Sequence, residues 1–184
     1  LAEAGYPNGA GFPPIQLQSN AEGFGYVQVA EAVQEMLQKV LNVPVSVSVL
    51  RGDQHFDRVD QGLVRLWREG WTADHPDAEN FLALLYGKNA VLDSALPASI
   101  NKTRYHSAYF DNWFRKARTE SDPRQRALDL AKAEAVAMHD LPVIPLYHED
   151  ATLLCQPWVH GLYLNAIEFL DLSGVWFDRP AVPL

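Results

Sequence analysis

A strand–helix–strand pattern near the amino end constrains the fold of this chain most. Apolar and polar residues alternate over 15–18 and again over 45–49, as they do in half-buried strands. The segment 25–41 between them carries apolar residues at helical spacing, and these are Val29, Val33, Met36, Leu37 and Val40. Asn42 and Pro44 end that helix. A crossover of this length favours parallel pairing of the two strands, so the chain is predicted to be an α/β protein.

Helices and short extended segments are predicted for the rest of the chain. We expect helices over 53–61, 77–86, 109–119 and 122–139, a strand over 63–67, a long loop over 88–106, and extended segments at 143–148, 151–155 and 159–164. The helix over 122–139 begins with Asp122 as N-cap, Pro123 at its first position and Gln125 reaching back in a capping box. Its predicted apolar face consists of Leu128, Ala131, Ala135 and Met138.

Composition excludes several classes of function. A net charge of −8 would be repelled by a phosphate backbone, so nucleic acid is not an expected partner. One cysteine, Cys155, rules out an intrachain disulfide and a zinc site of several cysteines, and its apolar neighbours favour a packing role. With 48% hydrophobic residues in 184, the chain is long and apolar enough to fold around a core.

The sequence was also searched for membrane-spanning segments and for a signal peptide. No segment approaches the roughly 20 apolar residues that span a bilayer, and no signal peptide is recognised, so direct membrane insertion is not expected. Residues 1–9 read like the end of a helix running into a Gly/Pro turn. We therefore expect this chain to be a piece of a longer protein.

The segment 66–82 has the most distinctive pattern in the chain. An apolar run ends at Gly70 and Trp71, Asp74 follows in a turn-forming sequence, and Asp77 stands where the N-cap of the next helix is expected. Asp74 serves either as a binding carboxylate or only as an organiser of this turn.

Six stretches in the same order resemble one family, the bacterial extracellular solute-binding proteins of the dipeptide and oligopeptide class (family 5). They are 3–9 (EAGYPNG), 30–34 (AEAVQ), 70–82 (GWTADHPDAENFL), 105–111 (YHSAYFD), 121–126 (SDPRQR) and 141–147 (LPVIPLY). The resemblance implies a single lobe of a type II periplasmic-binding-protein-like fold, a mixed sheet flanked by helices. Residues 1–170 would form the second, carboxyl-terminal lobe. Residues 171–184 would form a tail that returns toward a first lobe and is poorly ordered or bound to another chain here.

The resemblance also implies a function. The full-length protein would capture di- and oligopeptides in the periplasm or outside the cell and deliver them to a membrane ABC permease. A lipid anchor on the full-length protein is compatible with this location. No cofactor, no metal and no catalysis are implied.

Site residues follow from the same resemblance. Asp74 would pair with the free α-amino group of a peptide, through a charge-assisted hydrogen bond. Trp71 would line a side-chain pocket, the alternative being a core tryptophan. Arg68 would hold the peptide carboxylate, the alternative being an ion pair with Glu69 or another nearby acid.

Three weaker positions complete the predicted peptide site. Thr72 and Ala73 would offer backbone groups to the ligand main chain, as a sheet edge does to an added strand. Tyr105 would face the cleft, the alternative being a loop aromatic packed on the lobe. The chain departs from the family at Arg58, which stands one place away from the basic residue that some peptide binders carry before Gln61, and this puts carboxylate recognition in doubt.

Three other functions compete with peptide binding. Catalysis by Asp74, His75 and Asp77, or by the 148–150 cluster, is disfavoured because neither has the spacing of metal ligands on a helix. A member of the same family could instead bind a nickel chelate, haem, an opine, an antibiotic or an oligosaccharide. A plain interaction domain would leave Asp74 unpaired on a flat surface.

Overall fold

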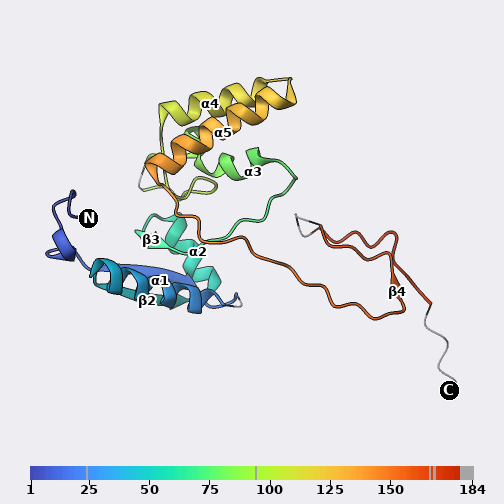
Figure 1. The fold of residues 1–184 in the computed structure, drawn as a ribbon, viewed down its shortest axis with the longest axis horizontal. Coiled ribbons are helices and arrows are strands. Elements are labelled where there is room, and N and C mark those ends of the chain that lie inside the picture. The colour runs from blue at the N-terminus through green and yellow to red at the C-terminus, as the bar shows by residue number, and fades with distance from the viewer. Residues whose placement is uncertain (24, 94, 166, 168, 179–184) are drawn as a thin grey trace, which may run out of the picture.

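The amino-terminal part of the fold is a three-stranded parallel sheet (Figure 1). The computed structural model describes residues 1–23, 25–93, 95–165, 167 and 169–178. A turn of 3-10 helix, η1 (Pro7–Gly9), precedes the sheet. The strands β1 (Ile15–Asn20), β2 (Val45–Leu50) and β3 (Leu66–Trp67) lie in the order β2-β1-β3. The predicted parallel pairing is confirmed, with Ile15 opposite Val45 and Leu17 opposite Val47.

Helix α1 (Tyr26–Leu41) connects β1 to β2 and packs on the sheet. Its Ala30, Val33 and Leu37 join a core with Leu17 and Val45. The helix ends as predicted, because Asn42 adopts a left-handed conformation (φ 54°) that lets its N–H reach carbonyls of the last turn. Not all of the apolar residues at helical spacing face the sheet, since Met36 is 64% exposed and Val40 is 77% exposed.

Helix α2 (Gly52–Asp60) connects β2 to β3. It contacts β1 through a polar core, since Gln18, expected on the polar side of β1, is fully buried. The Gln18 amide lies 3.1 Å from Nδ1 of the buried His55, and its oxygen accepts from Arg58 Nε at 3.0 Å. The third strand is shorter than the predicted 63–67.

A helical layer forms the second part of the body. It contains α3 (Ala78–Leu82), the 3-10 turns η2 (Ala83–Leu85) and η3 (Gly87–Asn89), α4 (Ala108–Thr119) and α5 (Pro123–Asp140). Helices α4 and α5 pack side by side around Phe110 and Phe114. The long loop before α4 is irregular as predicted, and Arg104 holds it by donating to the carbonyls of Val91, Asp93 and Leu96.

Helix α5 differs from its prediction in which face it buries. Asp122 caps it as expected, accepting from the N–H groups of Arg124 and Gln125. Gln125 does not reach back to the cap; it donates to Asp129 at 3.0 Å. The predicted apolar face is wrong at three of its four positions, because Leu128, Ala131 and Ala135 are exposed, while Met138 is partly buried against the core. The buried face consists of Asp129, Leu130, Ala133 and Ala137.

After α5 the chain leaves the body as an extended arm, which comprises the described residues between 141 and 178, namely 141–165, 167 and 169–178 (Figure 1). The segments expected at 143–148 and 151–155 form no strand in the part that the structure describes. β4 (Val159–His160) lies at the start of the extended segment expected over 159–164. It pairs antiparallel with β5 (Trp176–Phe177), a strand that had not been predicted. The sheet expected to be mixed is therefore two separate sheets, one parallel and one antiparallel. Cys155 is exposed rather than packed, and residues 179–184 of the predicted tail lie outside the described residues.

Candidate functional site

The carboxyl edge of the parallel sheet is the natural place for a site in this fold. The chain steps from β1 to β2 on one side and later to β3 on the other side. Ligands of open α/β sheets bind in the crevice outside the strand ends where the direction of winding reverses. The 68–80 turn, which holds most of the predicted site residues, leaves the sheet at this edge because it follows β3 directly.

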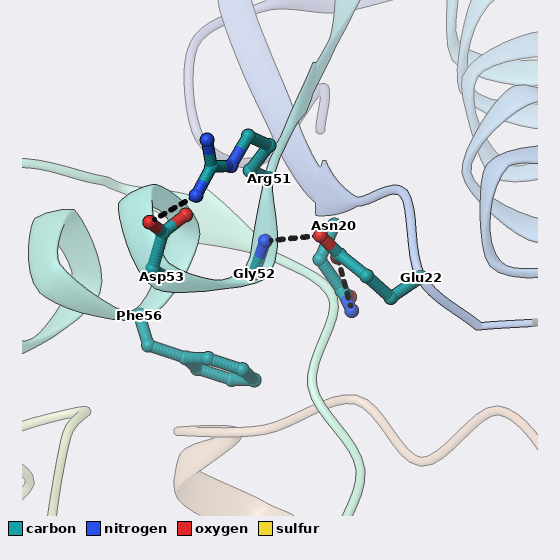
Figure 2. A pocket seen from close by; sticks show the side chains of 6 residues that line it. All are labelled: Asn20, Glu22, Arg51, Gly52, Asp53 and Phe56. Atoms are coloured by element: carbon teal, nitrogen blue, oxygen red, sulfur yellow. Dashed lines mark hydrogen bonds and ion pairs between the residues drawn. The ribbon is translucent and has the colours of Figure 1, made fainter.

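An open pocket of 470 Å³ lies at the same edge, where β1 and β2 end (Figure 2). Its lining residues are Asn20, Glu22, Arg51, Gly52, Asp53 and Phe56. The Glu22 carboxylate accepts from the Gly52 N–H at 2.7 Å, and this hydrogen bond holds the pKa of Glu22 below its ordinary value. Arg51 pairs with Asp53 at 2.8 Å. The Glu22–Gly52 hydrogen bond joins the loop after β1 to the start of α2, whereas the Arg51–Asp53 pair lies within the β2–α2 junction.

The 68–80 turn is organised around the side chain of Asn80 on α3. Its Oδ1 accepts from the Trp71 indole Nε1 at 2.6 Å and from the Asp74 backbone N–H at 3.2 Å. Its Nδ2 donates to Asp74 Oδ2 at 3.1 Å and lies 3.3 Å from His75 Nδ1. One amide therefore contacts two of the predicted peptide-binding residues.

Asp74 is exposed and forms no ion pair among the described residues. Its hydrogen bonds with Asn80 close the turn, so the turn-organising role is present. Its second oxygen, Oδ1, has no hydrogen-bond donor in the described part of the chain. The carboxylate can therefore accept a cation without first giving up another one.

Asp77 has a purely structural environment, as its predicted N-cap role implies. Its carboxylate accepts from the Glu79 N–H at 2.8 Å and receives two hydrogen bonds from Arg126. These bonds, the Arg126 ones foremost, hold the pKa of Asp77 below its ordinary value. The prediction that Asp77 caps α3 is confirmed.

Arg68 stacks on an aromatic ring instead of pairing with an acid. Its guanidinium carbon lies 3.2 Å from the centroid of the Tyr26 ring, a cation–π arrangement. The alternative of an ion pair with Glu69 is not found among the described residues, where Glu69 pairs with Lys102 at 2.7 Å. The guanidinium of Arg68 is thus positioned by Tyr26 and has no carboxylate partner in the described part of the chain.

The remaining predicted residues divide between the turn and the helical layer. Trp71 is 45% exposed, so it is not a core tryptophan. Thr72 is exposed beside it, whereas the side chain of Ala73 is buried. Tyr105 lies apart: its hydroxyl donates to Asp140 at 2.5 Å and its ring packs edge-on against Phe110. Burial, together with the Asp140 hydrogen bond, raises the pKa of Tyr105 to about 12. These contacts favour the packing alternative for Tyr105.

Two residues that organise the site had not been singled out from the sequence. Asn80 lies within the 70–82 stretch and Tyr26 near the start of the helix predicted over 25–41, but neither residue was given a role of its own from the sequence. A polar side chain one turn into a capped helix was the available signal for Asn80, because it faces back toward the preceding turn. Nothing in the local pattern joined Tyr26 to a residue 42 positions later.

The described residues contain no group of three or more His, Cys, Asp or Glu side chains arranged to hold a metal ion. The search for membrane spans, covering the same residues, found no helix both long and apolar enough to cross a bilayer.

The sequence matches the family model of bacterial extracellular solute-binding proteins, family 5 Middle, over residues 1–93, half of the chain. The chain belongs to this family. It is 29% identical to the oligopeptide-binding protein OppA of Bacillus subtilis over 96% of its own length and 30% of that protein. It is 25% identical to heme-binding protein A of Haemophilus influenzae over 97% of its length and 31% of that protein.

Solved structures give the fold. The chain superimposes on the murein tripeptide binding protein MppA of Escherichia coli with a TM-score of 0.78, covering 96% of this chain and 33% of that one at 24% identity. This neighbour has the type II periplasmic-binding-protein fold, so the α/β fold class inferred from the sequence is confirmed. The chain spans about three-tenths of the length of the curated relatives it matches.

Proposed function

We propose that this chain is the second ligand-binding lobe of a peptide-binding protein that serves an ABC importer. The full-length protein captures di- and oligopeptides in the periplasm or outside the cell and passes them to a membrane permease. It binds and releases its ligand without catalysing a reaction. Membership of the solute-binding family and the name of the OppA relative support this proposal.

The observation that carries the proposal is the state of Asp74. An exposed carboxylate that is held in one orientation and has no cation beside it among the described residues is suited to the ammonium group of a peptide. Once a closing cleft removes water from such a pair, losing one partner costs about 2–5 kcal/mol. Asp74 is therefore the anchor for the peptide amino terminus.

The neighbouring residues supply the other contacts of the proposed site. The exposed ring of Trp71 forms one wall of a side-chain pocket, where a flat apolar surface accepts varied residues. Thr72 and Ala73 offer backbone groups to the peptide main chain. Arg68, oriented by Tyr26, receives the carboxylate of the peptide, and its planar fork suits two parallel hydrogen bonds. Tyr105 takes the packing role that its contacts favour.

The extended arm supports an earlier domain boundary than the one predicted at residues 170 and 171. Large apolar side chains are exposed along its whole length, with Leu154 at 92%. Others on the arm are Leu141, Ile144, Leu146, Tyr147, Tyr163, Phe169, Leu172, Trp176 and Phe177. We propose that residues 1–140 form the lobe and that the arm packs against the other lobe of the full-length protein.

A non-peptide ligand is the alternative, since a relative of similar coverage is named as a heme-binding protein. Asp74 discriminates between the two, because neither haem nor a neutral sugar carries an ammonium group to pair with it.

Calorimetric titration of the full-length protein tests the proposal. Binding of a mixed library of di- to hexapeptides, with no heat from haem or cello-oligosaccharides, is the expected result. Failure of the whole library to bind, or tight binding of haem alone, would overturn the assignment to peptides.

A further inference from the structure

The geometry assigns to Asn80 the role of the positioning residue that fixes the Asp74 carboxylate and the Trp71 ring for recognition of a free peptide amine. This inference rests on the proposed function. It adds a residue to the site that touches no ligand in the proposal and acts through two residues that do.

The hydrogen-bond partners determine the orientation of the Asn80 amide. The Trp71 indole N–H and the Asp74 backbone N–H are donors only, so the Asn80 atom between them must be the oxygen. The Asp74 carboxylate is an acceptor when ionised, so the atom facing it must be the nitrogen. Flipping the amide would oppose donor to donor and acceptor to acceptor, which leaves one arrangement.

Asn80 is itself held in place by the structural part of the 66–82 segment. Its backbone N–H donates to the Asp77 carbonyl at 3.1 Å, in the first turn of α3. The Asp77 side chain caps that turn and is clamped by Arg126 of α5. The helical layer therefore holds Asn80 in place, and Asn80 in turn holds the turn that carries Asp74.

The two carboxylate oxygens of Asp74 have different surroundings, and this difference affects how a ligand binds. Asn80 Nδ2 satisfies Oδ2, and Oδ1 has no donor in the described part of the chain. A bound ammonium group therefore meets a carboxylate whose rotation is already restricted, and less ordering is needed on binding. The same amide oxygen holds the Trp71 ring, so the amine anchor and the side-chain wall keep a constant relative position.

The test compares peptides with and without a free amine in the full-length protein. Wild type, Asn80→Ala and the control Asn112→Ala, an exposed asparagine on α4, are titrated with trialanine and with N-acetyl-trialanine. A hydrogen bond to a charged group corresponds to about 10-fold or more in affinity. Asn80→Ala is expected to lower the preference for the free amine by about 10-fold, while Asn112→Ala keeps the wild-type preference.

A second variant separates positioning from folding. Asn80→Asp retains an oxygen acceptor for Trp71 Nε1 and the Asp74 N–H but places a second carboxylate beside Asp74. Two adjacent carboxylates favour sharing a proton. His75, whose Nδ1 lies 3.3 Å from Asn80 Nδ2, is present in both proteins, so the difference between them is the readout. In Asn80→Asp, affinity for trialanine is expected to fall more steeply than in wild type as pH drops from 7 to 5, and Trp71 fluorescence is expected to remain closer to wild type than in Asn80→Ala.

The outcomes are distinct. If Asn80→Ala keeps the wild-type preference, or weakens both peptides equally, Asn80 does not position the amine site and the inference fails alone. The inference also fails if the affinity of Asn80→Asp for trialanine has the same pH dependence as that of wild type. If wild type binds neither peptide, or binds both equally, the proposed amine anchor fails and this inference fails with it.

Discussion

Arg126 donates two hydrogen bonds to Asp77, from Nη1 to Oδ2 at 2.6 Å and from Nη2 to Oδ1 at 3.1 Å. A residue of α5 thereby clamps the cap of α3, 49 positions earlier in the chain. This relationship separates two acids that stand three residues apart. Asp77 has its charge neutralised within the lobe, whereas Asp74 has no cation among the described residues.

Removing the Asp77 side chain is expected to destabilise the protein. Asp77→Ala loses an N-cap, typically about 0.5–2 kcal/mol, and leaves Arg126 with only Glu79 among the acids it pairs with here. Asp77→Asn keeps a cap acceptor and should lose less. Urea unfolding of both variants, with Asp57→Ala on the exposed side of α2 as control, measures the difference. A loss in Asp57→Ala as large as in Asp77→Ala would contradict the account.

The buried His55 predicts a pH dependence of stability. Burial lowers the pKa of His55 below the ordinary value of about 6.5, because desolvation disfavours the imidazolium. Below pH 6.5 the unfolded chain therefore binds more protons at His55 than the folded protein does. The stabilisation by neutral His55 is fully present above pH 6.5 and is lost as the pH falls through the lower pKa that His55 has in the folded protein.

Unfolding free energies at pH 7 and pH 5 measure this contribution. His55→Gln should flatten the decline between the two pH values, whereas the exposed control His139→Gln should keep the wild-type decline. NMR titration of the wild-type histidines gives a second readout that does not depend on a variant folding. A His55 resonance that titrates above pH 6.5 would be incompatible with the buried, neutral ring.

Tyr105→Phe is expected to affect stability and not peptide binding. The variant loses the hydrogen bond to Asp140, worth about 1 kcal/mol net, and keeps the ring contact with Phe110. Thermal unfolding and calorimetric titration of one peptide measure the two effects. A fall in peptide affinity of more than about threefold, with unchanged stability, would place Tyr105 in the cleft instead.

The strand–helix–strand unit could be predicted because its cues are local. The alternation over 45–49 and the helical spacing within 25–41 each determine an element, and the crossover length determines how the strands pair. The Asp77 and Asp122 caps were predictable for the same reason, since each acts within three residues of itself.

Features that depend on distant partners could not be predicted. Asp129 is buried in α5 because Lys116, Lys132 and Gln125 supply hydrogen bonds to it, and this displaced the predicted apolar face. Gln18 is buried because His55 and Arg58, about 40 residues later, satisfy its amide. In the proposed site, Asp74 and Trp71 come from the family pattern, whereas Asn80 comes from its hydrogen bonds to both of them in the folded chain.

The arm predicts a difference in proteolysis between two forms of the protein. If residues 141–178 pack on another lobe, a protease should cut the isolated 184-residue chain soon after Asp140 and should spare that region in the full-length protein. Mass spectrometry of the early fragments measures this. Equal protection of the arm in both forms would indicate that it folds onto residues 1–140 instead.

The most direct test of the account is the effect of Asp74→Asn on amine recognition. Calorimetry of the full-length protein compares wild type, Asp74→Asn and the control Asp57→Asn, each titrated with trialanine and with N-acetyl-trialanine. If Asp74 anchors the peptide amine, Asp74→Asn loses at least about 10-fold in affinity for trialanine, with little change for the acetylated peptide, while Asp57→Asn behaves as wild type. Equal affinity of wild type and Asp74→Asn for trialanine would contradict it.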